Sequence, residues 1–144
     1  MEPYIISGLF TIAGAIVGGF IGYFSAKRMS AITTKCQAGI KLRAAFSFEM
    51  AQMRLFASGK TIAHPRDPQL KGGDYIHFLL NIALRKHAKA IEVFSPYVPD
   101  KHKKAYYEAW EKYYDSGFHN YYMGDKPYEL FFERIHAVLQ FTEI

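Results

Sequence analysis

The chain has 144 residues, half of them hydrophobic, and its formal net charge is +5. The single cysteine, Cys36, excludes an intrachain disulfide and agrees with a reducing compartment. The basic excess does not indicate a protein that binds nucleic acid, because no recognisable nucleic-acid motif accompanies it.

An uncharged run of 23 residues extends from Tyr4 to Ala26. A helix of this length and composition can cross the hydrocarbon core of a bilayer, so residues 1–26 are predicted to form a transmembrane segment. A cleaved signal peptide fits poorly, because no positive residue precedes the run and the run is longer than a usual signal core.

One face of this predicted helix carries only small or hydroxyl side chains, spaced three or four residues apart. Its members are Ser7, Thr11, Gly14, Gly18, Gly22 and Ser25. Glycines four residues apart allow two helix backbones to approach closely in lipid, where packing drives association. We therefore expect this face to contact other copies of the chain or to line a pore. The alternative is a span that serves only as an anchor.

Basic side chains follow the span directly. Lys27, Arg28 and Lys35 lie in this region, and no acidic residue occurs between Glu2 and Glu49. The positive-inside rule then places the N-terminus outside and the C-terminal part in the cytoplasm. The basic side chains are expected at the membrane surface, where anionic lipids attract them.

The sequence after the span predicts one cytoplasmic domain, residues 27–144, of the all-α class. The span continues as a helix to a stop at Gly59, and a loop rich in proline and glycine covers residues 60–73. Three further helices are predicted over residues 74–94, 100–116 and 127–144. No alternating run predicts a sheet. The expected architecture is a long helix against which three shorter helices pack as a bundle.

Apolar side chains recur at every third or fourth position of these helices and predict their inner faces. The predicted inner-face residues are Leu42, Phe46, Met50, Met53 and Phe56; Phe78, Ile82, His87, Ile91 and Phe94; Tyr106, Ala109, Trp110 and Tyr113; and Phe131, Ile135, Val138, Leu139 and Thr142. A histidine on an apolar face is far more often a hydrogen-bonded core residue than a catalyst, which is what we expect of His87.

The connection between the third and fourth helices contains more aromatic residues than a short connection needs. Phe118, Tyr121, Tyr122 and Met123 are interpreted as a surface that binds a protein partner, because aromatic side chains supply much of the binding energy of protein contacts. The alternative is that these residues fold back and complete the small core.

No motif indicates enzymatic chemistry. The six histidines have no H-x-x-x-H or H-E-x-x-H spacing, and Cys36 has no cysteine partner, so a metal site has no support. A P-loop, a G-x-G-x-x-G after a strand and a G-x-S-x-G elbow are absent from the sequence. We therefore expect neither enzymatic activity nor a cofactor.

A glycine-rich N-terminal span, a basic juxtamembrane helix and a short helical domain occur together with Arg43-Ala44-Ala45-Phe46, Lys86-His87-Ala88 and Ala109-Trp110. In this build the chain resembles a group of uncharacterised small single-span bacterial membrane proteins, and it is similar to the membrane effectors of anti-phage defence. The resemblance implies the bacterial inner membrane as location and a phage or host protein as trigger.

Two functional hypotheses follow. The first is an oligomeric pore-forming effector of anti-phage defence, opened when a partner gathers copies through the cytoplasmic domain. The alternative is a membrane-tethered helical adaptor that docks a cytoplasmic protein. The expected partners are other copies of the chain and the lipid bilayer, together with the trigger; nucleic acid is not among them.

Overall fold

The computed structural model describes residues 2–115, 117–123 and 127–143, without the side chains of residues 2–16, 119 and 127. The chain divides into two units, Met1–Cys36 and Gln37–Ile144. Helix α1, Glu2–Ala57, contributes residues to both units. The boundary predicted between residues 26 and 27 stays a prediction, since it concerns the end of a membrane span rather than the start of a packed unit.

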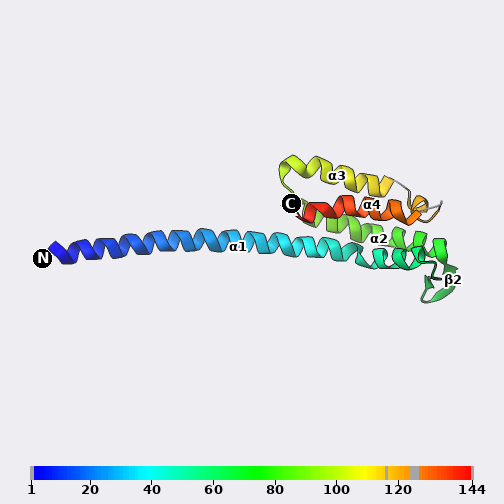
Figure 1. Cartoon of the computed structure of the whole chain (residues 1–144), viewed down its shortest axis with the longest axis horizontal. Coiled ribbons are helices and arrows are strands. Elements are labelled where there is room, and N and C mark those ends of the chain that lie inside the picture. Colours follow the sequence, from blue (N-terminus) through cyan, green and yellow to red (C-terminus); the bar gives the residue numbers. More distant parts are fainter. Residues whose placement is uncertain (1, 116, 124–126, 144) are drawn as a thin grey trace. The chain divides into compact units, whose positions relative to one another are not determined.

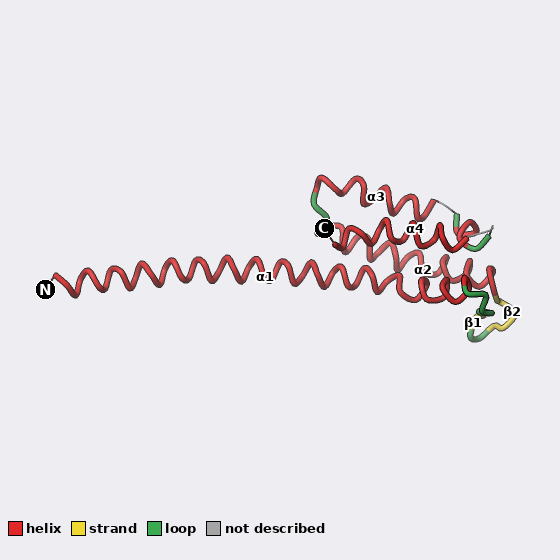
Figure 2. Tube along the Cα trace, viewed as in Figure 1, coloured by secondary structure: helices red, strands yellow, loops and turns green. Residues whose placement is uncertain are grey.

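The described part of the second unit is helical apart from one short hairpin (Figures 1 and 2). After α1 its elements are β1 (Ala63–His64), β2 (Asp67–Lys71), α2 (Gly72–Phe94), α3 (Asp100–Asp115) and α4 (Pro127–Leu139), with 3-10 turns at Ser95–Tyr97, Phe118–Tyr121 and Gln140–Glu143. The predicted all-α class is therefore confirmed for the described residues.

The prediction of a loop without strands over residues 60–73 is wrong. β1 and β2 form an antiparallel hairpin in which His64 pairs with Asp67 and Ala63 with Lys71. Local hydrogen bonds close the turn: the Arg66 amide donates to His64 Nδ1, and the Gln69 amide donates to Asp67 Oδ1. β1 has only two residues, and β2 contains Pro68, a residue that argues against a strand in a sequence, so neither strand was recognisable.

Gly59 ends α1, as the sequence predicts. Its φ of +75° lies in the left-handed region, which glycine adopts without the penalty of a Cβ atom. The Gly59 amide donates to the Phe56 carbonyl, and the Lys60 amide donates to the Leu55 carbonyl. These two bonds are those of a Schellman motif, which satisfies the last carbonyls of the helix and turns the chain toward the hairpin.

The helices of the second unit follow one another around the bundle in the order α1, α2, α3, α4, so that α1 also contacts α4. One contact for each neighbouring pair establishes this order. Helices α1 and α2 are joined by Glu49 and Lys86, and α2 and α3 by the Ile91 carbonyl and the Tyr106 hydroxyl. Between α3 and α4, the Tyr113 ring lies against the Phe131 ring, and between α1 and α4 the Arg54 guanidinium lies over the Phe132 ring. The bundle therefore has an α1/α2 side and, opposite it, an α3/α4 side.

Most of the predicted inner-face residues are buried, and they form one core. Their fully buried members include Leu42, Phe46, Met53, Ile91, Phe94, Tyr106, Tyr113, Phe131 and Ile135. Two residues of the predicted α2 face are corrections, because Phe78 is 37% exposed and Ile82 is 59% exposed. Ile82 lies five residues before the buried His87, which places the two side chains about 140° apart around a helix. The buried face of α2 instead includes Ile76, Leu80 and Ala83.

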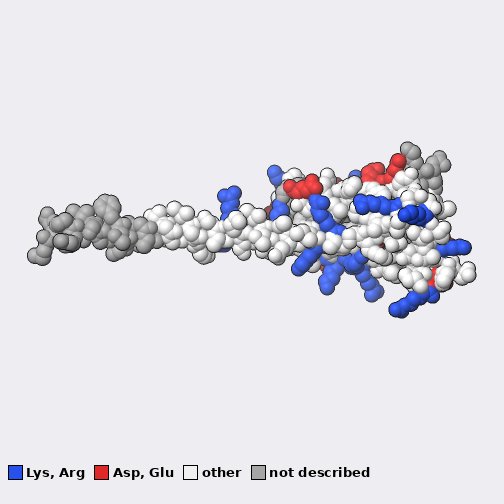
Figure 3. Space-filling model, turned by 60° about the horizontal axis from the view of Figure 1, so that its bottom comes forward, with Lys and Arg blue, Asp and Glu red and all other residues white. Residues whose placement is uncertain are grey.

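Charge is distributed unevenly over the bundle. Residues 37–94, which contain α2 and the packed part of α1, carry nine Lys and Arg but four Asp and Glu. Residues 95–144, which contain α3 and α4, carry six and eight. In Figure 3, Lys and Arg side chains spread over the whole visible face of the bundle and along its lower edge, whereas the larger groups of Asp and Glu lie along its upper edge. The α1/α2 half thus has a net positive charge, whereas the charges of the α3/α4 half nearly balance.

Candidate functional site

The described residues of the first unit form a helix whose large apolar side chains face outward. Val17 is 57% exposed, and Phe20, Ile21 and Phe24 are each more than 60% exposed. Ser7, Thr11 and Gly14 of the predicted small-residue face lie outside the residues whose side chains are described. Among the described residues, no helix is both long enough and apolar enough to cross a membrane.

The remaining members of the small-residue face are open on this helix. A Cβ atom added at Gly18 or Gly22 would meet nothing within 4 Å, and Ser25 is exposed. Of the three basic residues predicted at the membrane surface, Lys27 and Arg28 are exposed, whereas Lys35 is half-buried.

Inside the bundle, a polar network crosses the core from α1 to α3. Glu49 and His87 are 3% and 0% exposed, and the distance from Glu49 Oε2 to His87 Nε2 is 3.2 Å. On the other side of the imidazole, Nδ1 lies 3.1 Å from the hydroxyl of the fully buried Tyr113. Lys86 Nζ donates to both carboxylate oxygens of Glu49, at 2.7 and 3.0 Å.

The charge state of Glu49 decides how this network is protonated. Burial alone would raise the pKa of the Glu49 carboxyl, but the hydrogen bonds from His87 and Lys86 outweigh burial and hold the pKa below its usual value. The carboxylate is thus an acceptor, and Nε2 of His87 carries the proton donated to it. Burial raises the pKa of Tyr113 well above its usual range, so the hydroxyl beside Nδ1 keeps its proton.

The network lies within the packed core. The Phe46 ring stacks on the His87 ring with centroids 4.1 Å apart, and the Tyr121 hydroxyl donates to the Tyr113 carbonyl at 2.6 Å. Three cavities of about 320 to 390 Å³ lie on the bundle, and none of these three is lined by Glu49, His87 or Tyr113. The prediction that His87 is a hydrogen-bonded core residue is confirmed.

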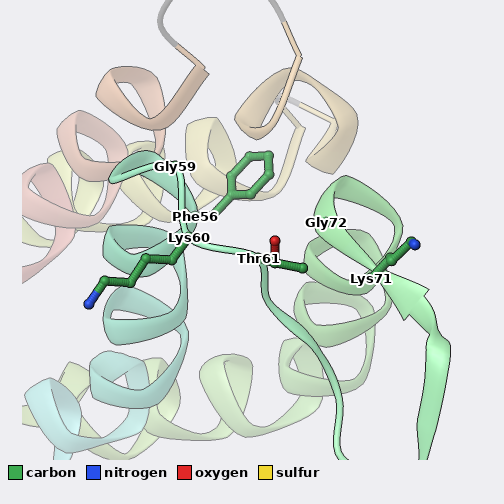
Figure 4. A pocket seen from close by; sticks show the side chains of 6 residues that line it. All are labelled: Phe56, Gly59, Lys60, Thr61, Lys71 and Gly72. Atoms are coloured by element: carbon green, nitrogen blue, oxygen red, sulfur yellow. The ribbon is translucent and has the colours of Figure 1, made fainter.

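The cavity of about 390 Å³ lies between the end of α1 and the start of α2 (Figure 4). It is lined by Phe56, Gly59, Lys60, Thr61, Lys71 and Gly72. The side chains of Lys60 and Lys71 point to opposite sides in Figure 4, away from each other. Because its charged groups do not converge, the cavity lacks the arrangement of a ligand site.

The aromatic connection divides into buried and accessible residues. Phe118 is 8% exposed and Tyr121 is fully buried, and the rings of both lie against Tyr113. The recognition surface predicted for these two residues is corrected, because both complete the core. Tyr122 is half-buried beside His77, and Met123 is 62% exposed, so the partner-binding role of these two stays a prediction.

Sequence reasoning missed Glu49. It lies three residues after Phe46 and four before Met53, on the buried stripe of α1, and it is the first acidic residue after Glu2. An acidic residue at such a position needs a buried partner. His87, which lies on the buried face of α2, is that partner. The two observations together would have predicted the pair.

The comparisons with known proteins give no relative. No protein-family model matches the chain, and neither does a curated protein or a solved structure. Among the residues that the structure describes, no group of three His, Cys, Asp or Glu side chains is placed to hold a metal ion. A functional proposal therefore rests on the arrangement of this chain's own residues.

Proposed function

We propose that the chain is an oligomeric single-span membrane effector, which forms a pore when its cytoplasmic helical domain is triggered. The observation that carries this proposal is the exposure of Val17, Phe20, Ile21 and Phe24 on the described part of α1. Burying each such side chain is worth about 1.5 to 3 kcal/mol, so leaving all four in water is costly. Lipid and other copies of the chain are the surroundings that we propose for them.

The uncharged run of the sequence extends this apolar surface toward the N-terminus. Together with Lys27 and Arg28 it supports a span with the N-terminus outside and the helical domain in the cytoplasm, in the bacterial inner membrane. Defence against phage, with a phage or host protein as trigger, is part of the proposal through the resemblance described above.

One helix alone cannot conduct ions, so a pore requires several copies. The open small-residue face at Gly18 and Gly22 supports self-association, because close contact between backbones is the main use of such a face in lipid. In one arrangement this face makes the contacts between helices. In the other it lines the lumen and the apolar side chains face lipid. In either arrangement, Lys27 and Arg28 would form a positive ring that favours anions at low salt.

A pair of glycine variants tests the proposal. Gly18 belongs to the small-residue face, whereas Gly19 lies about 100° away around the helix, and an added Cβ atom meets nothing at either position. We expect Gly18→Leu to reduce both the crosslinked oligomer and the membrane depolarisation that follows overexpression. Gly19→Leu adds the same side chain to the same span, and we expect it to retain both.

Two results would overturn the proposal. Equal oligomer size in both variants would remove the glycine face from the assembly. Unchanged membrane potential, with the native chain inserted and oligomeric, would refute the pore. A chain that still captured a cytoplasmic protein under those conditions would then be the membrane-tethered helical adaptor.

A further inference from the structure

The cavity of about 320 Å³ lies between α1 and α4, and its volume is at the lower end of the range of small-molecule sites in proteins. Three of the six side chains that line it carry nitrogen donors, and none of the six is acidic. The lining residues are Arg43, Ser47, Met50 and Arg54 on α1, and His136 and Leu139 on α4. All six belong to the second unit, so a role for this cavity does not depend on the function proposed for the span.

The lining distinguishes this cavity from the other two. At the cavity of about 390 Å³, the two lysines point away from each other (Figure 4). The cavity of about 330 Å³ is lined by Glu108 and Glu133 as well as by Lys112 and Arg134, so it contains charges of both signs. The cavity between α1 and α4 presents basic side chains without a carboxylate among its lining residues. Such a lining favours an anionic ligand.

Arg54 and His136 form one end of the cavity. The Arg54 guanidinium lies over the Phe132 ring, 5.5 Å from its centroid, and it makes no ion pair with any described residue. His136 is exposed and follows Phe132 by about one helical turn, so it lies at the same end of the cavity as Arg54. The neighbouring carboxylate of Glu133 is paired with Arg134 instead, at 3.5 Å. A guanidinium and an imidazole, both N–H donors, therefore approach this end from facing helices.

The other end of the cavity is partly neutralised. Arg43 donates from Nε to Thr142 Oγ1 at 3.0 Å and from Nη2 to Glu143 Oε1 at 2.8 Å. Two of the five N–H groups of this guanidinium are thus already used. Between the two ends, Met50 and Leu139 supply the apolar part of the lining. The cavity therefore has a basic end with free donors and an apolar stretch beside it.

From this arrangement we infer that the cavity binds a small organic phosphate, with the phosphate group between Arg54 and His136. The carbon part of the ligand lies against Met50 and Leu139. Donors from two helices suit a phosphate, because its terminal oxygens point in different directions, whereas the two oxygens of a carboxylate lie in one plane. Arginine also matches phosphate geometry with two parallel N–H groups. A soluble phosphate ester and a phospholipid headgroup share this chemistry.

Titration with phenyl phosphate tests the inference on the full chain in nonionic micelles. This probe combines a phosphate with an apolar ring, and benzoate, which has a carboxylate on the same ring, is the matched control ligand. By calorimetry, phenyl phosphate should bind more tightly than benzoate. Arg54→Gln should weaken the binding of phenyl phosphate about tenfold or more, because it removes hydrogen bonds to a charged group. His136→Ala should weaken it about fivefold.

A matched variant controls for the loss of charge. Arg85→Gln removes an arginine at an exposed position of α2 outside the cavity, and binding should not change. Arg54, His136 and Arg85 are all exposed, and the fluorescence of Trp110, the single tryptophan, verifies that each variant remains folded.

A second probe distinguishes the two sources of the phosphate. Glycerophosphoglycerol is the headgroup of phosphatidylglycerol without its acyl chains. Tighter binding of this diester than of phenyl phosphate would support a phospholipid headgroup as the ligand, and weaker binding would support a soluble phosphate monoester.

Three outcomes would overturn the inference. The first is that neither phosphate probe binds at millimolar concentration. The second is equal affinity for phenyl phosphate and benzoate, which would show that the site does not select a phosphate. The third is an equal effect of Arg54→Gln and Arg85→Gln, which would show that the cavity is not where the probe binds.

Discussion

Replacement of Glu49 probes how the buried network stabilises the bundle. Glu49→Ala leaves the imidazole of His87, which is fully buried, without the acceptor at 3.2 Å. Leaving that buried Nε2–H without an acceptor costs about 1 to 3 kcal/mol, and loss of the solvent-screened Lys86 pair adds up to about 1 kcal/mol. The packed unit contains residues 37–144, and for a domain near this size each kcal/mol corresponds to about 4 to 8 °C in melting temperature. The expected fall is therefore at least about 4 °C.

Two companion variants divide this effect among the partners of Glu49. Glu49→Gln keeps an oxygen that accepts a hydrogen bond but removes the charge, so it should cost about 1 kcal/mol, less than Glu49→Ala. Lys86 is 47% exposed at its side chain, and Lys86→Ala should cost no more than about 1 kcal/mol because solvent screens that pair. The predicted order of destabilisation is Glu49→Ala, then Glu49→Gln, then Lys86→Ala.

The assay uses the fluorescence of Trp110, whose ring lies 5.6 Å from that of Tyr113, during thermal unfolding of the full chain in micelles. Because the folded pKa of Glu49 is lowered, its stabilisation is complete above the ordinary glutamate pKa of about 4.3 and is lost as the pH falls toward the folded pKa. The difference between native and Glu49→Gln chains should therefore shrink on acidification. A difference that grew with acidification, or a Lys86→Ala chain as unstable as Glu49→Ala, would refute this account.

Three further predictions concern topology, the aromatic connection and one close contact. A reporter fused to the C-terminus should be active only in the cytoplasm, and activity only outside would reverse the proposed orientation. Tyr121→Ser should unfold the bundle at a cost of about 3 kcal/mol or more, whereas Met123→Ser, at a 62% exposed site, should leave the melting temperature unchanged. Gly73→Ala should destabilise the bundle, because the new Cβ atom would lie 2.7 Å from the Tyr122 ring; in a Tyr122→Ala background the same change should cost nothing.

The sequence was sufficient to predict the helices because their signals are local and repeated. Gly59 ends α1 and Pro127 begins α4, and both are terminal residues with a physical reason of their own. The stripe of Leu42, Phe46 and Met53 is buried as its spacing indicates. Such predictions need only residues within one or two turns of each other.

Predictions failed where the deciding partner lies far away in the sequence. Phe78 and Ile82 follow a helical spacing just as Ile76 and Leu80 do, and only the positions of α1 and α3 determine which of the two stripes becomes the core. The same reason explains Phe118, whose burial depends on Tyr113 of the preceding helix. Aromatic composition alone does not distinguish a core from a binding surface.

The apolar residues of α2 that were wrongly assigned to the core form an exposed stripe. A helix with apolar residues on two sides carries more apolar surface than one small core can cover, and Ile82 with Phe48 of α1 is the part left outside. Arg85 and Lys89 lie on the same outward side of α2 and keep this surface hydrated. The surplus apolar residues that misled the assignment of the core therefore form an exposed surface of mixed apolar and basic character.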